Sequence, residues 1–183
     1  MKKSTSITIT VILLISIGLL SAWGYNEQKI SFAEPNEAIL STNKGLVLIP
    51  AYKNDDRSLF FFIKDKNNLG AAVAHKGVFG WKSGMSAWSP FNKRGDYETF
   101  GGYQGYGDQL IYGLIRNPEK KIIMADDREA AMLNLEMLPQ SVVKEYNLKD
   151  LYLWYFESEN TLNIEQLKLL QKDTQEVIQS IDL

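Results

Sequence analysis

The longest apolar run of the chain lies at its N-terminus. Residues 7–23 contain no charged side chain, and Lys2 and Lys3 precede them. A helix rises about 1.5 Å per residue and needs roughly 20 residues to cross a bilayer core of about 30 Å, and the uncharged residues on both sides of the run supply that length. Because lysines favour the cytoplasmic side, the pattern predicts a hydrophobic helix with its N-terminus inside.

This run can be either a retained membrane anchor or a cleaved signal peptide. Trp23 and Tyr25 stand where aromatic side chains favour the headgroup region, which indicates a retained anchor. Residues 22–24 and 31–33 fit the small-x-small rule of a cleavage site, which indicates a signal peptide that is removed. We expect the anchor, with cleavage as the alternative.

The predicted organisation follows from this helix. A signal-anchor helix occupies residues 1–26 and contacts the membrane through residues 6–25, and residues 27–183 form one extracytoplasmic domain. The expected location is therefore the cell membrane, in a single pass with the N-terminus inside and the C-terminal domain outside. If the leader is cleaved, the domain is secreted.

Behind this helix, short apolar runs alternate with turn residues, a pattern typical of antiparallel strands. The runs that predict strands are residues 46–52, 58–64, 71–75, 78–82, 109–115, 122–124, 130–135 and 151–156. Pro50 places the first of them near a sheet edge, and residues 67–70 predict a turn. Residues 34–40 and 139–146 predict short helices. The fold class is therefore α+β and β-rich, with one compact domain of mostly antiparallel strands and one or two short helices.

The C-terminal segment fits two patterns. Apolar residues of residues 164–181 nearly satisfy helical spacing, yet they also alternate as two strands around Lys172 and Asp173. Periodicity alone does not choose between a helix and a β-hairpin.

A group of short motifs occupies residues 101–104, 111–115, 118–122, 129–130, 153–155 and 167–178. Together they resemble a pattern in small membrane-anchored or secreted β-rich proteins of unknown function from Gram-positive bacteria. The resemblance implies a β-rich outer domain and favours a hairpin at the C-terminus. It implies no activity.

Composition and charge fit a folded, exported domain. The chain is 45% hydrophobic and 23% charged, which is ordinary for a globular protein, and without cysteine its stability depends on packing alone. Residues 28–94 hold ten basic and five acidic residues, whereas residues 95–183 hold eight basic and sixteen acidic ones. The basic half could face anionic lipids or wall polymers, or the two halves could neutralise each other, which we favour. The cations are spread singly, so no nucleic-acid partner is expected.

The residue types available for catalysis are few. His75 is the only histidine and cysteine is missing, so a histidine triad, a thiol nucleophile and a multi-histidine metal site are not expected. We predict no catalytic constellation, no metal and no cofactor. Asp96 and Glu98 would share one face of a strand, and Asp108 follows in a turn. Such carboxylates could act as acid and base in a glycan hydrolase, although exposed turn carboxylates are commoner.

Aromatic side chains indicate a function more clearly than these carboxylates do. The candidate ligand or partner surface consists of Trp81, Trp88, Tyr97, Tyr103 and Tyr106. Flat rings displayed on a sheet can stack on sugars or receive the side chains of a partner. Core packing accounts for most aromatics of this region, and we expect Trp81 and Trp88 to be at least partly exposed.

These observations favour a binding module over an enzyme. We predict a membrane-anchored extracytoplasmic binding or interaction module whose partner is a protein or a cell-wall polymer. One alternative is a carboxylate-dependent hydrolase of cell-wall glycans that uses Asp96, Glu98 or Asp108. The other is a secreted immunity or inhibitor-type protein whose uneven charge matches one partner.

Overall fold

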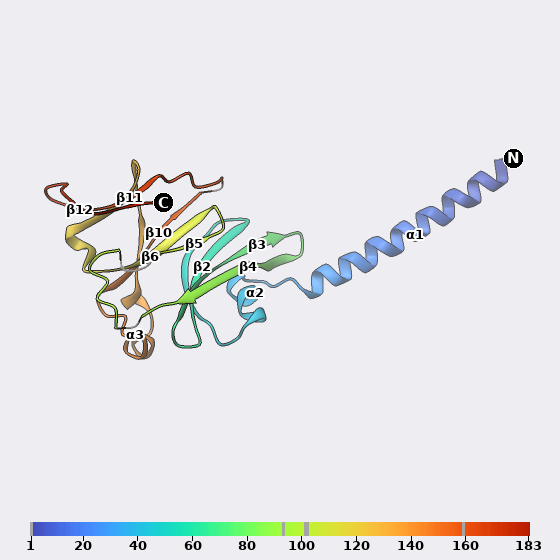
Figure 1. Ribbon diagram of the computed structural model, residues 1–183. Coiled ribbons are helices and arrows are strands. Elements are labelled where there is room, and N and C mark those ends of the chain that lie inside the picture. Colours follow the sequence, from blue (N-terminus) through green and yellow to red (C-terminus); the bar gives the residue numbers. More distant parts are fainter. Residues whose placement is uncertain (1, 93, 101–102, 159) are drawn as a thin grey trace. The chain divides into compact units, whose positions relative to one another are not determined.

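The computed structural model describes residues 2–92, 94–100, 103–158 and 160–183 (Figure 1). Side chains are described from Ile12 onward, apart from Met85, Tyr103, Tyr106 and the residues outside those ranges. The chain divides into two compact units. Unit 1 comprises Met1–Lys44, Tyr52–Leu59 and Ala72–Met85, and unit 2 comprises Gly45–Ala51, Phe60–Ala71 and Ser86–Leu183.

The described chain is β-rich, with three four-stranded sheets and few helices, which confirms the α+β class. The helices are α1 (Lys2–Lys29), α2 (Pro35–Thr42) and α3 (Gln140–Tyr146), with 3-10 turns η1 (Pro118–Lys120) and η2 (Leu135–Met137). The strands are β1 (Val47–Lys53), β2 (Arg57–Lys64), β3 (Asn68–Gly77), β4 (Gly80–Pro90), β5 (Tyr103–Tyr106), β6 (Leu110–Arg116), β7 (Lys121–Ala125), β8 (Arg128–Glu129), β9 (Ala131–Asn134), β10 (Leu151–Glu157), β11 (Gln166–Gln171) and β12 (Val177–Asp182).

Unit 1 holds the first two helices. α1 covers the whole apolar run of the N-terminus. Among the residues that the structure describes, no helix is long and apolar enough to cross a membrane. The signal anchor therefore stays a prediction of the sequence. α2 confirms the short helix predicted at residues 34–40, and it begins with Pro35 behind a capping box between Glu34 and Glu37.

The first sheet is a meander in the order β1-β2-β3-β4. Its consecutive strands are joined by short turns, which only antiparallel neighbours allow. β1, with Pro50, lies at the edge, as predicted. The turn predicted at residues 67–70 is present but lies earlier, at residues 65–67, where Asp65 and Lys66 adopt positive φ, and Gly70 already lies within β3.

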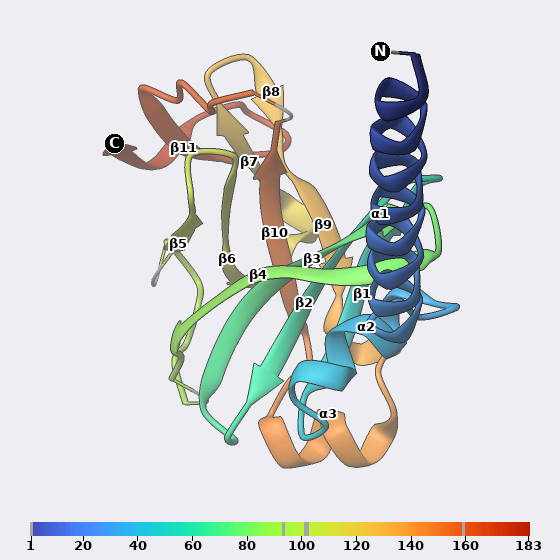
Figure 2. The same cartoon turned by 90° about the vertical axis from the view of Figure 1, so that its right-hand side faces the viewer.

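The other two sheets belong to unit 2 (Figure 2). In the order β5-β6-β10-β9, strand β10 is central, with Trp154 opposite Gly113 of β6 and Met132 of β9. In the order β12-β11-β7-β8, strand β11 pairs with β12 and with β7. The C-terminal segment is thus a hairpin rather than a helix.

The described core of unit 2 contains a cluster around Trp154. Its ring lies edge-on to Phe100 and Phe156, with centroids 5.8 and 6.2 Å apart. Ile123 of β7 and Leu169 of β11 are opposite each other in the register and are both buried in the same cluster. The continuous apolar run of β10 is explained by this burial.

Candidate functional site

A pocket of about 310 Å³ lies in unit 2 along the segment that follows β4. Polar groups line it together with rings and small residues. The residues that define its chemistry are Ser89, Phe91, Asn92, Asp96, Tyr97 and Gln104. They come from the end of β4, from the segment after it and from β5. The pocket therefore combines hydroxyl, amide and carboxylate groups with aromatic surface.

Tyr97 fixes the shape of the segment beside this pocket. Its hydroxyl donates a hydrogen bond to the carbonyl of Asn92 (2.7 Å), and the Arg116 N–H donates to the Tyr97 carbonyl (2.8 Å). Tyr97 has φ +52°, and a Cβ on Gly95 would lie 2.8 Å from its ring. Burial raises the pKa of the Tyr97 phenol above its ordinary value of 10.0, so this hydroxyl stays a donor at neutral pH.

Gln104 is positioned by the pairing of β5 with β6. It stands directly opposite Tyr112 in the register, and the Tyr112 hydroxyl donates to the Gln104 Oε1 (2.7 Å). Because the amide oxygen is the acceptor in this bond, the amide NH₂ is the group that Gln104 can donate to a ligand.

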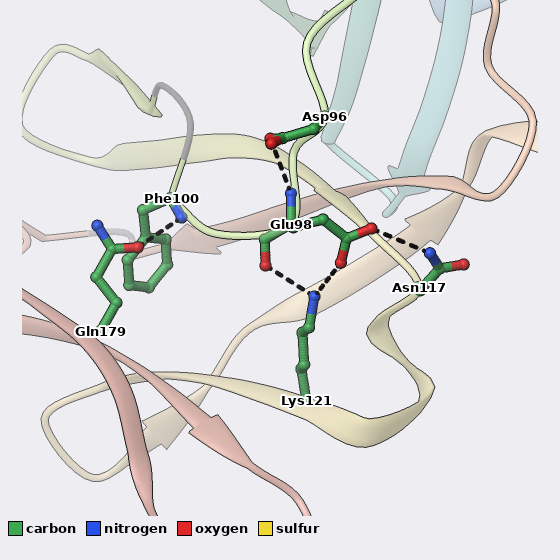
Figure 3. A network of polar contacts seen from close by, with 6 residues as sticks. All are labelled: Asp96, Glu98, Phe100, Asn117, Lys121 and Gln179. Carbon is green, nitrogen blue, oxygen red and sulfur yellow. Dashed lines mark hydrogen bonds and ion pairs between the residues drawn. The ribbon is translucent and has the colours of Figure 1, made fainter.

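A polar network adjoins the pocket through Asp96 (Figure 3). The Asp96 carboxylate accepts a hydrogen bond from the Glu98 N–H (3.3 Å). The Glu98 carboxylate accepts from the Lys121 ammonium (2.7 Å) and from the Asn117 amide (3.2 Å). Lys121 also donates to the Glu98 carbonyl (2.7 Å). Its hydrogen bond to the Glu98 carboxylate is the main cause that lowers the pKa of that carboxyl below its ordinary value of 4.5.

A long-range contact holds the far end of the same segment. The Phe100 N–H donates to the side-chain oxygen of Gln179 (2.8 Å), which lies on β12. The Phe100 ring packs against Trp154 in the core. The segment from Asn92 to Phe100 is therefore tied to the sheets of unit 2 at several points, even though the described part of it contains no helix or strand.

The structure does not bring the three carboxylates to one site. The expectation that Asp96 and Glu98 share a strand face is wrong, because the left-handed conformation of Tyr97 between them breaks the extended chain. Asp108 lines a different pocket of about 300 Å³, together with Gly105 and Ile164. A general acid needs a raised pKa, whereas Lys121 favours the charged form of Glu98.

Two of the predicted surface aromatics are buried. Trp81 is only 2% exposed, which contradicts the expectation that it is partly exposed. Its backbone pairs with Phe32, and the ammonium groups of Lys53 and Lys76 lie 5.7 and 5.9 Å from its ring centre. Tyr97 is buried as well and contributes a wall to the pocket rather than an open surface.

Among the predicted aromatics whose side chains the structure describes, Trp88 is the one that reaches the surface. It is 47% exposed, which confirms its expected exposure, and the Lys64 ammonium lies 3.7 Å from its ring centre. The ring also contacts Phe62. The side chains of Tyr103 and Tyr106 lie outside the described residues.

Residues that the sequence did not single out carry much of the site. Gln179 and Lys121 act through partners that are 79 and 23 positions away in the chain. The partners of Asn92 and Gln104 are five and eight positions away. Within the described part of the chain, no group of three histidine, aspartate or glutamate side chains could hold a metal ion.

Protein-family models, curated proteins and solved structures gave no significant match to this chain. Function therefore has to be inferred from the residues described above.

Proposed function

We propose that this protein is a membrane-anchored binding module of the cell surface. Its pocket would take a small, uncharged polar group, such as one sugar unit of a cell-wall polymer. The observation that carries this proposal is the lining of the pocket. Asn92, Asp96 and Gln104 offer donors and acceptors for hydroxyl groups, and Phe91 offers an aromatic surface beside them.

The size and rigidity of the pocket support the same class of ligand. A volume of about 310 Å³ lies at the lower end of the range for ligand pockets, which suits one ring better than a long segment. The hydrogen bonds of Tyr97 to Asn92 and Arg116 hold the wall in place before a ligand arrives. Less conformational entropy is then lost on binding.

The anchor is proposed from the sequence. The lysine pair before the uncharged run of residues 7–23 supports a helix that spans the membrane with the domain outside. Cell fractionation tests it: the full chain should stay with membranes after alkaline extraction, and a version without residues 1–26 should be released. Release of the full chain by the same extraction would contradict the anchor.

The hydrolase alternative has less support. It needs a second carboxyl group close to Asp96 that holds its proton at neutral pH. Glu98 is engaged by Lys121 and Asn117, and Asp108 lines another pocket. The binding function is therefore the better conclusion.

Binding can be measured by titration calorimetry with the purified full chain and soluble saccharide fragments of the cell wall. Gln104→Ala should weaken binding about fivefold, because a lost hydrogen bond is worth about 1 kcal/mol. Gln140→Ala is the matched control, since Gln140 is exposed at the start of α3 and does not line the pocket. Thermal unfolding of both variants checks that the fold is retained. Equal affinity of Gln104→Ala and the wild type would refute this pocket as the binding site.

A further inference from the structure

The tip of the β3–β4 hairpin is apolar and exposed. The turn consists of Val78 and Phe79, of which Val78 is 88% and Phe79 43% exposed. Two-residue hairpin turns favour Asn, Asp and Gly where the turn needs positive φ, and neither Val78 nor Phe79 has a positive φ. A valine and a phenylalanine at such a tip gain nothing from contact with water, so the geometry of the turn does not explain them.

This tip lies beside the C-terminal part of α1, within unit 1 (Figure 1). The Phe79 ring is edge-on to Trp23 with centroids 6.1 Å apart. A Cβ on Gly24 would stand 3.7 Å from the Phe79 Cζ, so this glycine lets the ring approach the helix. One turn further along α1, Glu27 forms an ion pair with Lys82 of β4. The tip is thus level with Trp23 and Gly24.

The base of the hairpin is fixed as well. Phe32, which follows α1, exchanges two backbone hydrogen bonds of 2.8 Å with Trp81. Gly80 has φ +135°, and a Cβ there would lie 2.5 Å from the Phe32 carbonyl oxygen. Only glycine allows this close approach. The hairpin and the segment that leaves α1 are therefore held together as one piece.

We propose that the β3–β4 tip is a second membrane contact, in which Val78 and Phe79 insert into the interfacial region of the bilayer that α1 spans. The inference rests on the proposed anchor. Trp23 ends the uncharged run of residues 7–23 and Gly24 follows it, so a side chain level with them lies where the helix leaves the hydrocarbon. Aromatic side chains favour this depth, and burial of apolar surface favours insertion.

The charges around the tip suit phospholipid headgroups. Lys76 flanks it on β3, whereas the ammonium of Lys82 on β4 is held by Glu27 of α1. The sequence holds no acidic residue between Asp65 and Asp96. Lysines beside a bilayer extend their ammonium groups toward lipid phosphates while their stems cover apolar surface. The occupant of the tip is therefore lipid, and the contact would hold the hairpin of unit 1 against the outer leaflet.

Labelling at single cysteines tests the proposal, because the chain has no cysteine of its own. Val78→Cys carries an environment-sensitive fluorophore in the full chain, reconstituted into nanodiscs of phosphatidylcholine and phosphatidylglycerol. Val177→Cys is the matched control, since Val177 is also an exposed valine, 58% exposed, at the start of β12. Leu14→Cys, inside the apolar run, reports whether α1 spans the bilayer.

The expected result is blue-shifted emission at Val78 and quenching by lipids with a shallow spin label, without either effect at Val177. Quenching at Leu14 by a deep spin label, combined with water-like emission at Val78, would refute the inference and leave the anchor intact. Unquenched probes at both Leu14 and Val78 would refute the membrane anchor as well as the membrane contact of the hairpin tip. Blue-shifted emission at Val78 without quenching would mean that protein covers the tip, which also overturns the proposal.

Discussion

Gly70 stands in β3 where its neighbours leave no room for a side chain. A Cβ at this position would lie 2.5 Å from the carbonyl oxygen of Ala87 and 2.7 Å from the Phe62 Cε2. Neither neighbour moves easily, because one is backbone of the adjoining strand β4 and the other is a buried ring. Gly70→Ala therefore forces β3, β4 or the Phe62 ring to shift.

The size of the effect follows from two opposing terms. Overpacking destabilises the folded state by about 1–3 kcal/mol. Replacing a glycine by alanine offsets about 0.5–1 kcal/mol of this, because the unfolded chain then has less conformational entropy to lose on folding. We expect a net loss of about 1–2 kcal/mol in the free energy of unfolding, or about 2–8 °C in Tm. Because Phe62 contacts Trp88, the tryptophan emission of the folded protein should also change.

Urea unfolding of the full chain, followed by tryptophan fluorescence, measures this loss. Gly105→Ala is the control, because the nearest atom to its Cβ would be the Gly107 carbonyl oxygen at 4.0 Å. It should stay within about 0.5 kcal/mol of the wild type. If Gly70→Ala were as stable as Gly105→Ala, the steric reasoning about β3 would be refuted.

Three further variants test the site and the core. Tyr97→Phe should lose about 0.5–1.5 kcal/mol of stability with the hydrogen bond to Asn92, measured by urea unfolding; an unchanged midpoint would contradict that role. Glu98→Gln should lose about 0.2–1 kcal/mol at neutral pH. Since Lys121 lowers the Glu98 pKa, the wild-type advantage is complete above pH 4.5 and disappears as the pH falls through the lowered pKa; a pH-independent difference would refute this. Ile123→Ala should cost about 2–5 kcal/mol because this side chain is fully buried, and a calorimetric Tm close to wild type would be inconsistent with the packing.

The elements that the sequence predicted well are those whose signals are local. α3 begins after Pro139 and ends at Tyr146, close to the predicted residues 139–146. β10 is central in its sheet, and its continuous apolar run predicted that place. Both signals lie within fewer than ten residues, so no knowledge of distant partners was needed.

The features that the sequence did not predict depend on contacts between different segments of the chain, and not on the local pattern of residues. Trp81 is buried, and Phe32, whose backbone pairs with it, is far away in the sequence. The left-handed conformation of Tyr97 depends on partners at Asn92 and Arg116, and a non-glycine residue gives no local warning of it. Pocket residues such as Gln104 likewise acquire their role only when β5 meets β6.

The long-range bond between Phe100 and Gln179 also has a consequence for synthesis. The two residues are 79 positions apart. At about 5–20 residues per second, Gln179 is made about 4–16 s after Phe100. During that interval β7 also lacks β11, so the buried face around Ile123 is uncovered. Strands β11 and β12 follow the other described strands of unit 2 in the chain, so this unit can close only after they have been made.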